Sequence, residues 1–229
     1  MKIHFIKQLL LIGAITISTS SLSHAADNLV VDSQSAVSEW GKLDNDRDIS
    51  KLVSGWMYRD TAQWDKLQNI FTPDATIEVT WFEGKATDFI NASKKMGTSK
   101  LSAKHLISNP VIEYHGDKAI AETDVMIVVH NDSIKLGSTV HARFYDQIKK
   151  VDNEWKISRR QVFYDFGSFN YPAGPVEIDQ KIVEKFPVAY APLGYLLNSG
   201  GYPVNRIFAT KNSDAEKLIR KQGQAWLKK

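Results

Sequence analysis

The chain has 229 residues, no cysteine, a formal net charge of +3 and a hydrophobic fraction of 43%. This composition excludes collagen-like, coiled-coil and wholly disordered proteins. Without cysteine there can be no disulfide, thiolate nucleophile or cysteine-ligated metal centre. Leaving out residues 1–25 removes two lysines, so that 27 basic residues face 26 acidic ones. A net charge of +1 is too small to indicate a protein that binds nucleic acid, and we expect no nucleic-acid partner.

Residues 1–25 have the three parts of a secretory signal peptide. Lys2 and Lys7 precede or border the short apolar run 9–15, and Ser23-His24-Ala25 is a small-x-small cleavage site. A membrane anchor is the alternative, but the run is far shorter than the ~20 residues that a spanning helix needs. We therefore expect cleavage after Ala25 and a soluble, exported protein in the periplasm or outside the cell, with no membrane span.

The mature chain begins with helices and continues with strands. Apolar residues at helical spacing predict a first helix through Ile49–Met57 and a second from Trp64 to Phe71, which Thr72-Pro73-Asp74 would end. A strand over 76–82 and a helix over 86–96 follow. Further strands are predicted at 105–114, 118–130, 134–149 and 154–166, separated by turn residues. This order predicts an α+β fold with helices packed on a strongly curved, mostly antiparallel sheet.

The composition of the sequence changes after residue 166, where five of the seven prolines lie between Pro172 and Pro203. A last helix is predicted at about 212–227. We expect the tail to wrap or cover the domain without forming a second core, and segment 170–211 to pack over the open end of the sheet or at a subunit contact. The predicted divisions are a signal peptide (1–25), an N-terminal extension (26–44), an α+β barrel domain (45–168) and a Pro-rich extension with a terminal helix (169–229).

Asp60 is the first candidate for chemistry. It follows Trp56 by four residues and Ile49 by eleven, which places its carboxylate on the apolar stripe of the first helix. A carboxylate buried there needs a partner, because burial of an unpaired charge costs several kcal/mol. The alternative is a solvent-facing Asp at the end of the helix.

The four histidines of the mature chain lie in or beside predicted strands. His115 belongs to a turn, whereas His105, His130 and His141 can point into a concave sheet. Their spacing matches no metal-binding motif, and the chain has neither a Gly-x-Ser-x-Gly elbow, a phosphate loop nor a dinucleotide fingerprint. We therefore expect no metal and no cofactor.

Five short segments in order resemble one known family. They are Trp56–Asp60, Trp64–Leu67, Phe71–Ala75, His105–Asn109 and Asp152–Ile157. Over about residues 45–168 the chain resembles the SnoaL-like branch of the nuclear transport factor 2-like superfamily, and within it scytalone dehydratase and hexachlorocyclohexane dehydrochlorinase. These relatives are cofactor-free lyases, usually trimeric, on a cone-shaped α+β barrel. The resemblance implies that fold and a homo-oligomer, either trimer or dimer.

The resemblance also implies a catalytic dyad. The family's Asp falls on Asp60 and its His on His105, while the dehydrochlorinase Arg falls on Arg160 and a second pocket His falls loosely on His130. Strand parity conflicts with Arg160, since alternation puts Trp155 and Arg159 on one face. Either Trp155 faces away from the cavity or a bulge resets the register.

Two positions depart from the family pattern. Gly55 stands where the dehydrochlorinase has a lysine, and Arg59 stands where the dehydratase has a tyrosine, although Tyr58 is adjacent. The substrate contacts therefore do not transfer directly. Aromatic residues are the candidates for lining a substrate pocket, with membership of an ordinary core as their alternative: Trp56, Tyr58, Trp81, Phe82, Phe144, Phe163 and Tyr164.

Three functions are compatible with these residues. The first is a cofactor-independent lyase or isomerase, in which His105 removes a proton from a small hydrophobic cyclic substrate, Asp60 orients His105, and Arg160 or a tyrosine stabilises developing negative charge. The second is a non-catalytic module that binds a lipid or metabolite in the same cavity. The third is a structural export protein whose tail mediates assembly. The dyad residues favour the first function.

Overall fold

The computed structural model describes residues 41–229, so the predicted signal peptide and its cleavage site lie outside the described residues. Asn45–Lys229 form one compact unit, whose fold is described here. Residues 41–54 are helical. The other helices are α2 (Met57–Asp60), α3 (Trp64–Asn69), α4 (Ala86–Met96), α5 (Gln180–Val183), α6 (Ala191–Ser199) and α7 (Asp214–Leu227). The strands are β1 (Phe71–Val79), β2 (Phe82–Lys85), β3 (Leu101–Ile107), β4 (Val111–His115), β5 (Lys118–Asn131), β6 (Leu136–Val151) and β7 (Glu154–Asn170).

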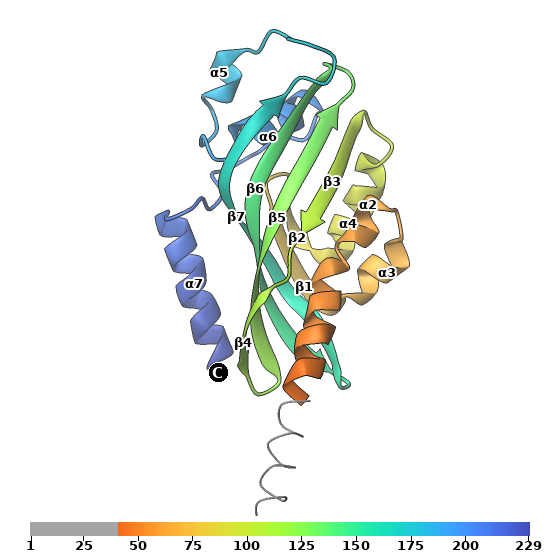
Figure 1. The fold of residues 1–229 in the computed structure, drawn as a ribbon, viewed down its shortest axis with the longest axis vertical. Helices are drawn as coiled ribbons and strands as arrows, with labels where there is room; N and C mark the ends of the chain where they lie inside the picture. Colours follow the sequence, from red (N-terminus) through yellow and green to blue (C-terminus); the bar gives the residue numbers. More distant parts are fainter. Residues whose placement is uncertain (1–40) are drawn as a thin grey trace, which may run out of the picture. The chain divides into compact units, whose positions relative to one another are not determined.

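The seven strands form one mixed sheet in the order β2-β1-β7-β6-β5-β3, with β4 also paired to β5. Only the pairing of β1 with β7 is parallel. The long strands β5, β6 and β7 curl so that the sheet forms a half-barrel, with α2, α3 and α4 on one side of it (Figure 1). The predicted α+β fold with helices on a strongly curved sheet is confirmed.

Two bulges bend β7 against β6. Asp165 has no partner between the pairs His141–Phe166 and Ala142–Tyr164, and Ser158 has none between Ile148–Ile157 and Gln147–Arg159. A bulge adds a residue to one strand, which increases the local bend and twist. The bulges therefore account for part of the curl of the sheet.

The bulge at Ser158 also resolves the parity conflict in β7. With one extra residue in the strand, Trp155, Ile157 and Arg160 are all buried, whereas Arg159 is partly exposed. Trp155 therefore does not need to face away from the interior. Of the two open alternatives, the reset of the register is the one present in the protein.

Several predicted boundaries were wrong for identifiable reasons. The first helix breaks at Gly55-Trp56 before continuing as α2, and the strand predicted at 105–114 is two strands, β3 and β4, interrupted around Pro110. Strand β1 begins at Phe71, ahead of the predicted stop, because the chain there already pairs with Ile157 of β7. Pro73 is tolerated because the β1–β7 register is irregular between residues 71 and 76.

The C-terminal segment belongs to the same unit. Helix α6 packs against β5, β6 and β7 and is buried over most of its length, so the segment covers the sheet as predicted. Helix α7 lies on the other side of the sheet (Figure 1). The tail forms no core of its own, as expected, because α7 packs on the sheet in a small cluster that includes residues of β5, β6 and β7: Ile120, Tyr145, Phe163, Ala209, Ile219 and Leu227. Within residues 41–229 no helix is long and apolar enough to cross a membrane.

Candidate functional site

A cavity of about 320 Å³ lies between the helices and the concave face of the sheet. Helix α2 contributes its last two residues, and β5 contributes Ile127 and Val129. Strand β3 contributes Leu101, Ser102, Ala103 and His105. Leu193 and Leu197 of α6 complete the wall, so the C-terminal segment forms part of the cavity. The volume is at the lower end of the range for pockets that hold small organic ligands.

Asp60 and His105 form a hydrogen-bonded pair in the cavity wall. The Nδ1 atom of His105 lies 2.8 and 3.0 Å from the two carboxylate oxygens of Asp60, and the backbone N–H of His105 donates to Oδ2 at 2.7 Å. The two side chains are 2% and 7% exposed, which excludes a solvent-facing Asp. The hydrogen-bonded contact predicted from the sequence is present.

Local structure explains how this pair forms. Asp60 is the last residue of α2, one helical turn after Trp56, and both residues face the cavity. In β3, buried and exposed residues alternate, so that Leu101, Ala103 and His105 share the cavity face. His105 pairs with Ile127 of β5. Strand pairing thus fixes the backbone of His105, and the carboxylate of Asp60 fixes its imidazole ring.

Burial lowers the pKa of His105 below its ordinary value of 6.5. The hydrogen bond and the charge of Asp60 act in the opposite direction, while the charges of Arg59 and Arg160 lower the pKa further. For Asp60, burial raises the pKa, but the hydrogen bonds and charge of His105 together with the charge of Arg59 outweigh it and lower the pKa. The pair therefore consists of a neutral imidazole and a carboxylate near pH 7.

Arg59 is the guanidinium that lines the cavity. Its side chain is 9% exposed and contacts Asp60 Oδ1 only at 3.5 Å, while Nη2 lies 3.3 Å from the sulfur of Met96. The Nε atom is buried and has no hydrogen-bond partner among the residues described. Burial lowers the pKa of Arg59, although the charge of Asp60 opposes this.

Arg160 does not line the cavity, contrary to the role expected for it. Its side chain is fully buried and forms a bidentate pair with Asp146 at 2.8 and 2.6 Å. The guanidinium lies against the rings of Trp56 and Phe144, 4.8 and 4.1 Å from their centroids. Those rings stand between Arg160 and the cavity, so the nearest cavity-facing cation is Arg59. Neither Arg159 nor Arg160 lines the cavity.

The predicted aromatic residues divide into two groups. Four of them line the cavity: Trp56, Trp81, Phe144 and Tyr164. Tyr58 does not, since its ring faces Lys66 and the region of Gly55. Phe82 packs on Trp81 and Phe89, and Phe163 lies in the cluster under α7.

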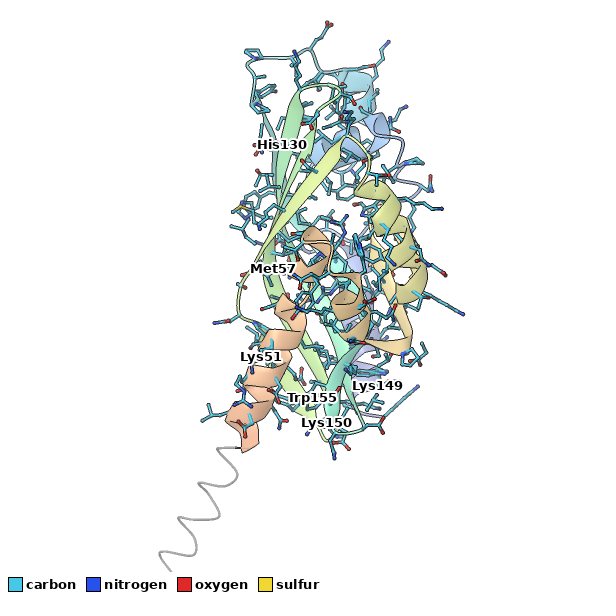
Figure 2. All side chains as sticks on the ribbon, turned by 90° about the vertical axis from the view of Figure 1, so that its right-hand side faces the viewer. Lys51, Met57, His130, Lys149, Lys150 and Trp155 are labelled. Carbon is cyan, nitrogen blue, oxygen red and sulfur yellow. The ribbon has the colours of Figure 1, made fainter. Side chains whose placement is uncertain are left out.

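His130 is also absent from the cavity wall. It alternates in β5 with Val129, which faces the cavity, and its ring lies against Gly137 of β6. Figure 2 shows His130 toward one end of β5, away from the level of Met57 in α2. The loose family match therefore does not place this histidine in the site. No group of three or more metal-binding side chains occurs within the described part of the chain.

Gly55 has a packing reason to be glycine. A Cβ atom there would lie 2.8 Å from the Cγ2 atom of Ile70 and 2.9 Å from the carbonyl oxygen of Leu52. A lysine at this position would push these neighbours apart. The family's lysine is thus replaced by a close approach between the first helix and the end of α3.

Sequence reasoning missed Arg59 as a cavity residue, although a signal was available. Arg59 follows Leu52 by seven residues and Trp56 by three, which is the same helical spacing that singled out Asp60. It was treated only as a departure from the family's tyrosine. The apolar stripe of the first helix in fact ends in two adjacent opposite charges.

Comparison with known proteins gives one family match. The family model described as a SnoaL-like domain matches residues 41–161, more than half of the chain. A PEP2-like protein of Fusarium vanettenii is 26% identical over 200 residues, covering 78% of this chain and 84% of the relative. Pea pathogenicity protein 2 of the same fungus is 24% identical over 157 residues, covering 64% and 66%.

Solved structures share the fold at low sequence identity. The crystal structure of LinA has a TM-score of 0.52 and 20% identity, covering 62% of this chain and 99% of that one. A protein from Novosphingobium aromaticivorans, described as a candidate scytalone dehydratase, has a TM-score of 0.50 and 19% identity, covering 59% and 97%. The cone-shaped fold of these proteins is the fold found here. The family match ends at residue 161, so the C-terminal segment lies beyond it.

Proposed function

Because the chain belongs to the SnoaL-like domain family of the nuclear transport factor 2-like superfamily, we propose that it is a cofactor-independent lyase or isomerase. In this proposal an Asp60–His105 dyad removes a proton from a small hydrophobic cyclic substrate. The observation that carries the proposal is the 2.8 Å contact between His105 Nδ1 and Asp60 in the wall of an aromatic-lined cavity. Solved neighbours include a dehydrochlorinase, which supports a lyase.

In the proposed mechanism each member of the dyad has its own role. Asp60 accepts a hydrogen bond from Nδ1–H and fixes the tautomer in which Nε2 carries no proton. Nε2 then takes the proton from a carbon of the substrate. In a lyase the electron pair of the broken C–H bond forms a double bond as the leaving group departs with its bonding electrons; in an isomerase an existing double bond moves and Nε2 returns the proton to another carbon. Asp60 stabilises the imidazolium so formed.

The low pKa of His105 fits a base that works near neutral pH. A base must be unprotonated before the reaction, and burial keeps this imidazole neutral. General-base catalysis gives on the order of 10²–10⁴-fold, so the apolar walls have a second task, which is to exclude water. Five aromatic side chains supply those walls: Trp56, Trp64, Trp81, Phe144 and Tyr164.

Arg160 then acts as a positioning residue. It holds Trp56 and Phe144 by their ring faces, and Trp56 lies edge-on to His105 at a centroid distance of 5.9 Å. Its charge also lowers the pKa of His105 through space. This proposal replaces the direct contact with substrate that the family resemblance implied.

A non-catalytic binding module is the second candidate function. The close packing of Gly55 favours it, because the lysine of the dehydrochlorinase has no equivalent here. A binding module would use the same cavity for a small hydrophobic molecule and would not need the dyad for affinity.

The experiment is a metabolite screen of the purified mature protein, with His105→Ala and Asp60→Asn as test variants. We expect His105→Ala to lose at least about 100-fold in turnover and Asp60→Asn to lose most activity, because the wrong tautomer is then favoured. His115→Ala is the matched control, since this histidine is the exposed last residue of β4. Thermal unfolding is measured on the same preparations. Wild-type turnover by His105→Ala would contradict the mechanism.

We also propose that the mature protein is exported and forms a homo-oligomer. N-terminal sequencing of the secreted or periplasmic protein tests cleavage after Ala25. Light scattering tests whether the mass corresponds to a dimer or a trimer. An uncleaved N-terminus, or the mass of a monomer at all concentrations, would contradict these two proposals.

A further inference from the structure

Arg59 differs from the other buried arginine near the cavity in how its charge is matched. Arg160 has a carboxylate of its own, bound by two short hydrogen bonds, and lies outside the cavity wall. Arg59 lies in the wall and shares Asp60 with His105. A buried cation with so few acceptors is costly unless something else offsets its charge.

Asp60 offsets the charge of Arg59 only in part. Its two oxygens already accept from the backbone N–H and the Nδ1–H of His105 at 2.7–3.0 Å. The contact with Arg59 is longer, at 3.5 Å. A guanidinium has five N–H donors, and among residues 41–229 its other acceptor is the thioether sulfur of Met96, which accepts weakly.

The surroundings of Arg59 indicate what shape of partner fits. The guanidinium lies 5.7 Å from the ring centroid of Trp81 and 6.0 Å from that of Phe89. Beyond it the cavity has apolar and aromatic walls and room for a molecule of one or two rings. Planar oxyanions pair with guanidinium groups through two parallel hydrogen bonds.

We propose that the cavity binds a ring-sized carboxylate, whose oxygens pair with Arg59 while its ring lies between the aromatic walls. This inference rests on the proposed function in one respect, namely that a small hydrophobic ligand occupies the cavity. It adds the charge of that ligand. The carboxylate is an anchor and not the reacting group, so the dyad acts on a carbon elsewhere in the ring.

The test compares 2-naphthoate with its neutral isostere 2-naphthamide. Binding is measured by calorimetry and by quenching of tryptophan fluorescence, since Trp56 and Trp81 line the cavity. We expect the wild-type protein to bind the carboxylate on the order of tenfold or more tightly than the amide, as for a charge-assisted pair. Arg59→Gln should lose this preference and keep its affinity for the amide within about twofold, while Arg59→Lys should keep part of the preference.

The matched control is Arg159→Gln, which removes a partly exposed guanidinium outside the cavity and should leave the preference unchanged. Equal affinity of the wild-type protein for both probes, or an anion preference that survives in Arg59→Gln, would overturn the proposal. If Arg59→Gln fails to fold, Arg59→Lys decides. Because the measurement needs no turnover, a catalytically silent protein that still prefers the carboxylate would contradict the lyase and leave the anion site standing.

Discussion

The two sides of the sheet differ in how completely their buried arginines are paired with carboxylates. On the face under α7, Arg143 binds Asp165, Glu122 and Glu216 at 2.7–2.9 Å, and Arg220 binds the same two glutamates. On the concave face, Arg59 has one distant carboxylate and an unpaired Nε. Saturated networks fasten elements together, whereas an unsaturated charge beside a cavity is a cost to folding that a ligand can offset. The comparison separates a structural face from a functional one.

Arg160 shows that the contrast concerns pairing and not burial alone. It is fully buried on the concave side, yet a bidentate pair with Asp146 matches its charge, and only Nη1 has no hydrogen-bond partner among the described residues. The three arginines therefore represent three cases: Arg160 is fully buried with a closely paired charge, Arg143 is partly exposed with a closely paired charge, and Arg59 lies beside the cavity with a carboxylate only at 3.5 Å. Their substitutions should rank in that order.

The largest effect is expected for Arg160→Met. The substitution leaves Asp146 charged and buried without a partner, so the free energy of unfolding should fall by about 3–5 kcal/mol. The double variant Arg160→Met with Asp146→Leu is the control, because it removes both charges and should recover most of the loss. Denaturant unfolding measures both. A single variant as stable as wild type would show that this pair does not hold the core.

Arg143→Met should have an intermediate effect. It breaks ion pairs with three carboxylates and removes the arginine that binds Asp165, while Glu122 and Glu216 keep Arg220. We expect a loss of about 1–3 kcal/mol in the free energy of unfolding, which is the range for hydrogen bonds to charged groups. Added salt should reduce the loss, since these groups are only partly buried. A loss that does not depend on salt would instead indicate that packing of α7 dominates.

Arg59→Met should change stability least, by within about 1 kcal/mol in either direction. Asp60 keeps its hydrogen bonds to His105, and the variant no longer buries an unsatisfied cation. The same denaturant titration measures it beside the other two variants. A loss as large as that of Arg160→Met would place Arg59 among the structural residues and remove the contrast between the two faces.

The dyad adds a dependence of stability on pH. The pKa of His105 is lowered in the folded protein, so the unfolded chain binds a proton more readily once the pH falls below about 6.5. The free energy of unfolding should therefore fall with pH from about 6.5 downward, and the lowered pKa of Asp60 extends the loss further into acid. His105→Gln should flatten the first part of this curve. An unchanged curve would mean that His105 titrates alike in both states.

The sequence predicted the parts of the site that depend on local pattern. Helical spacing put Asp60 on an apolar stripe, and the family order paired it with His105. Aromatic residues at Trp56, Trp81, Phe144 and Tyr164 reached the cavity as expected. The prediction that failed, which placed Arg160 in the cavity, depended on the register of β7. A single bulge at Ser158 decides which arginine of β7 is buried, and alternation along a strand cannot reveal a bulge.

The role of Arg160 failed for a second reason. Its partner Asp146 lies fourteen residues earlier on β6, and the sequence gives no sign that the two are directly opposite. Likewise, the parallel pairing of β1 with β7 moved the start of β1 from residue 76 to Phe71, because long-range pairing overrides a local stop signal. These are tertiary effects that no local pattern contains.

The most direct test of the account is the protonation state of His105, measured by NMR on protein with ¹⁵N-labelled histidine. The account predicts that near pH 7 the ring is neutral with the proton on Nδ1, and that its pKa lies below 6.5. His105→Ala assigns the signals. A ring protonated on Nε2, or a pKa above 6.5, would contradict the claim that Asp60 holds His105 as a base facing the cavity.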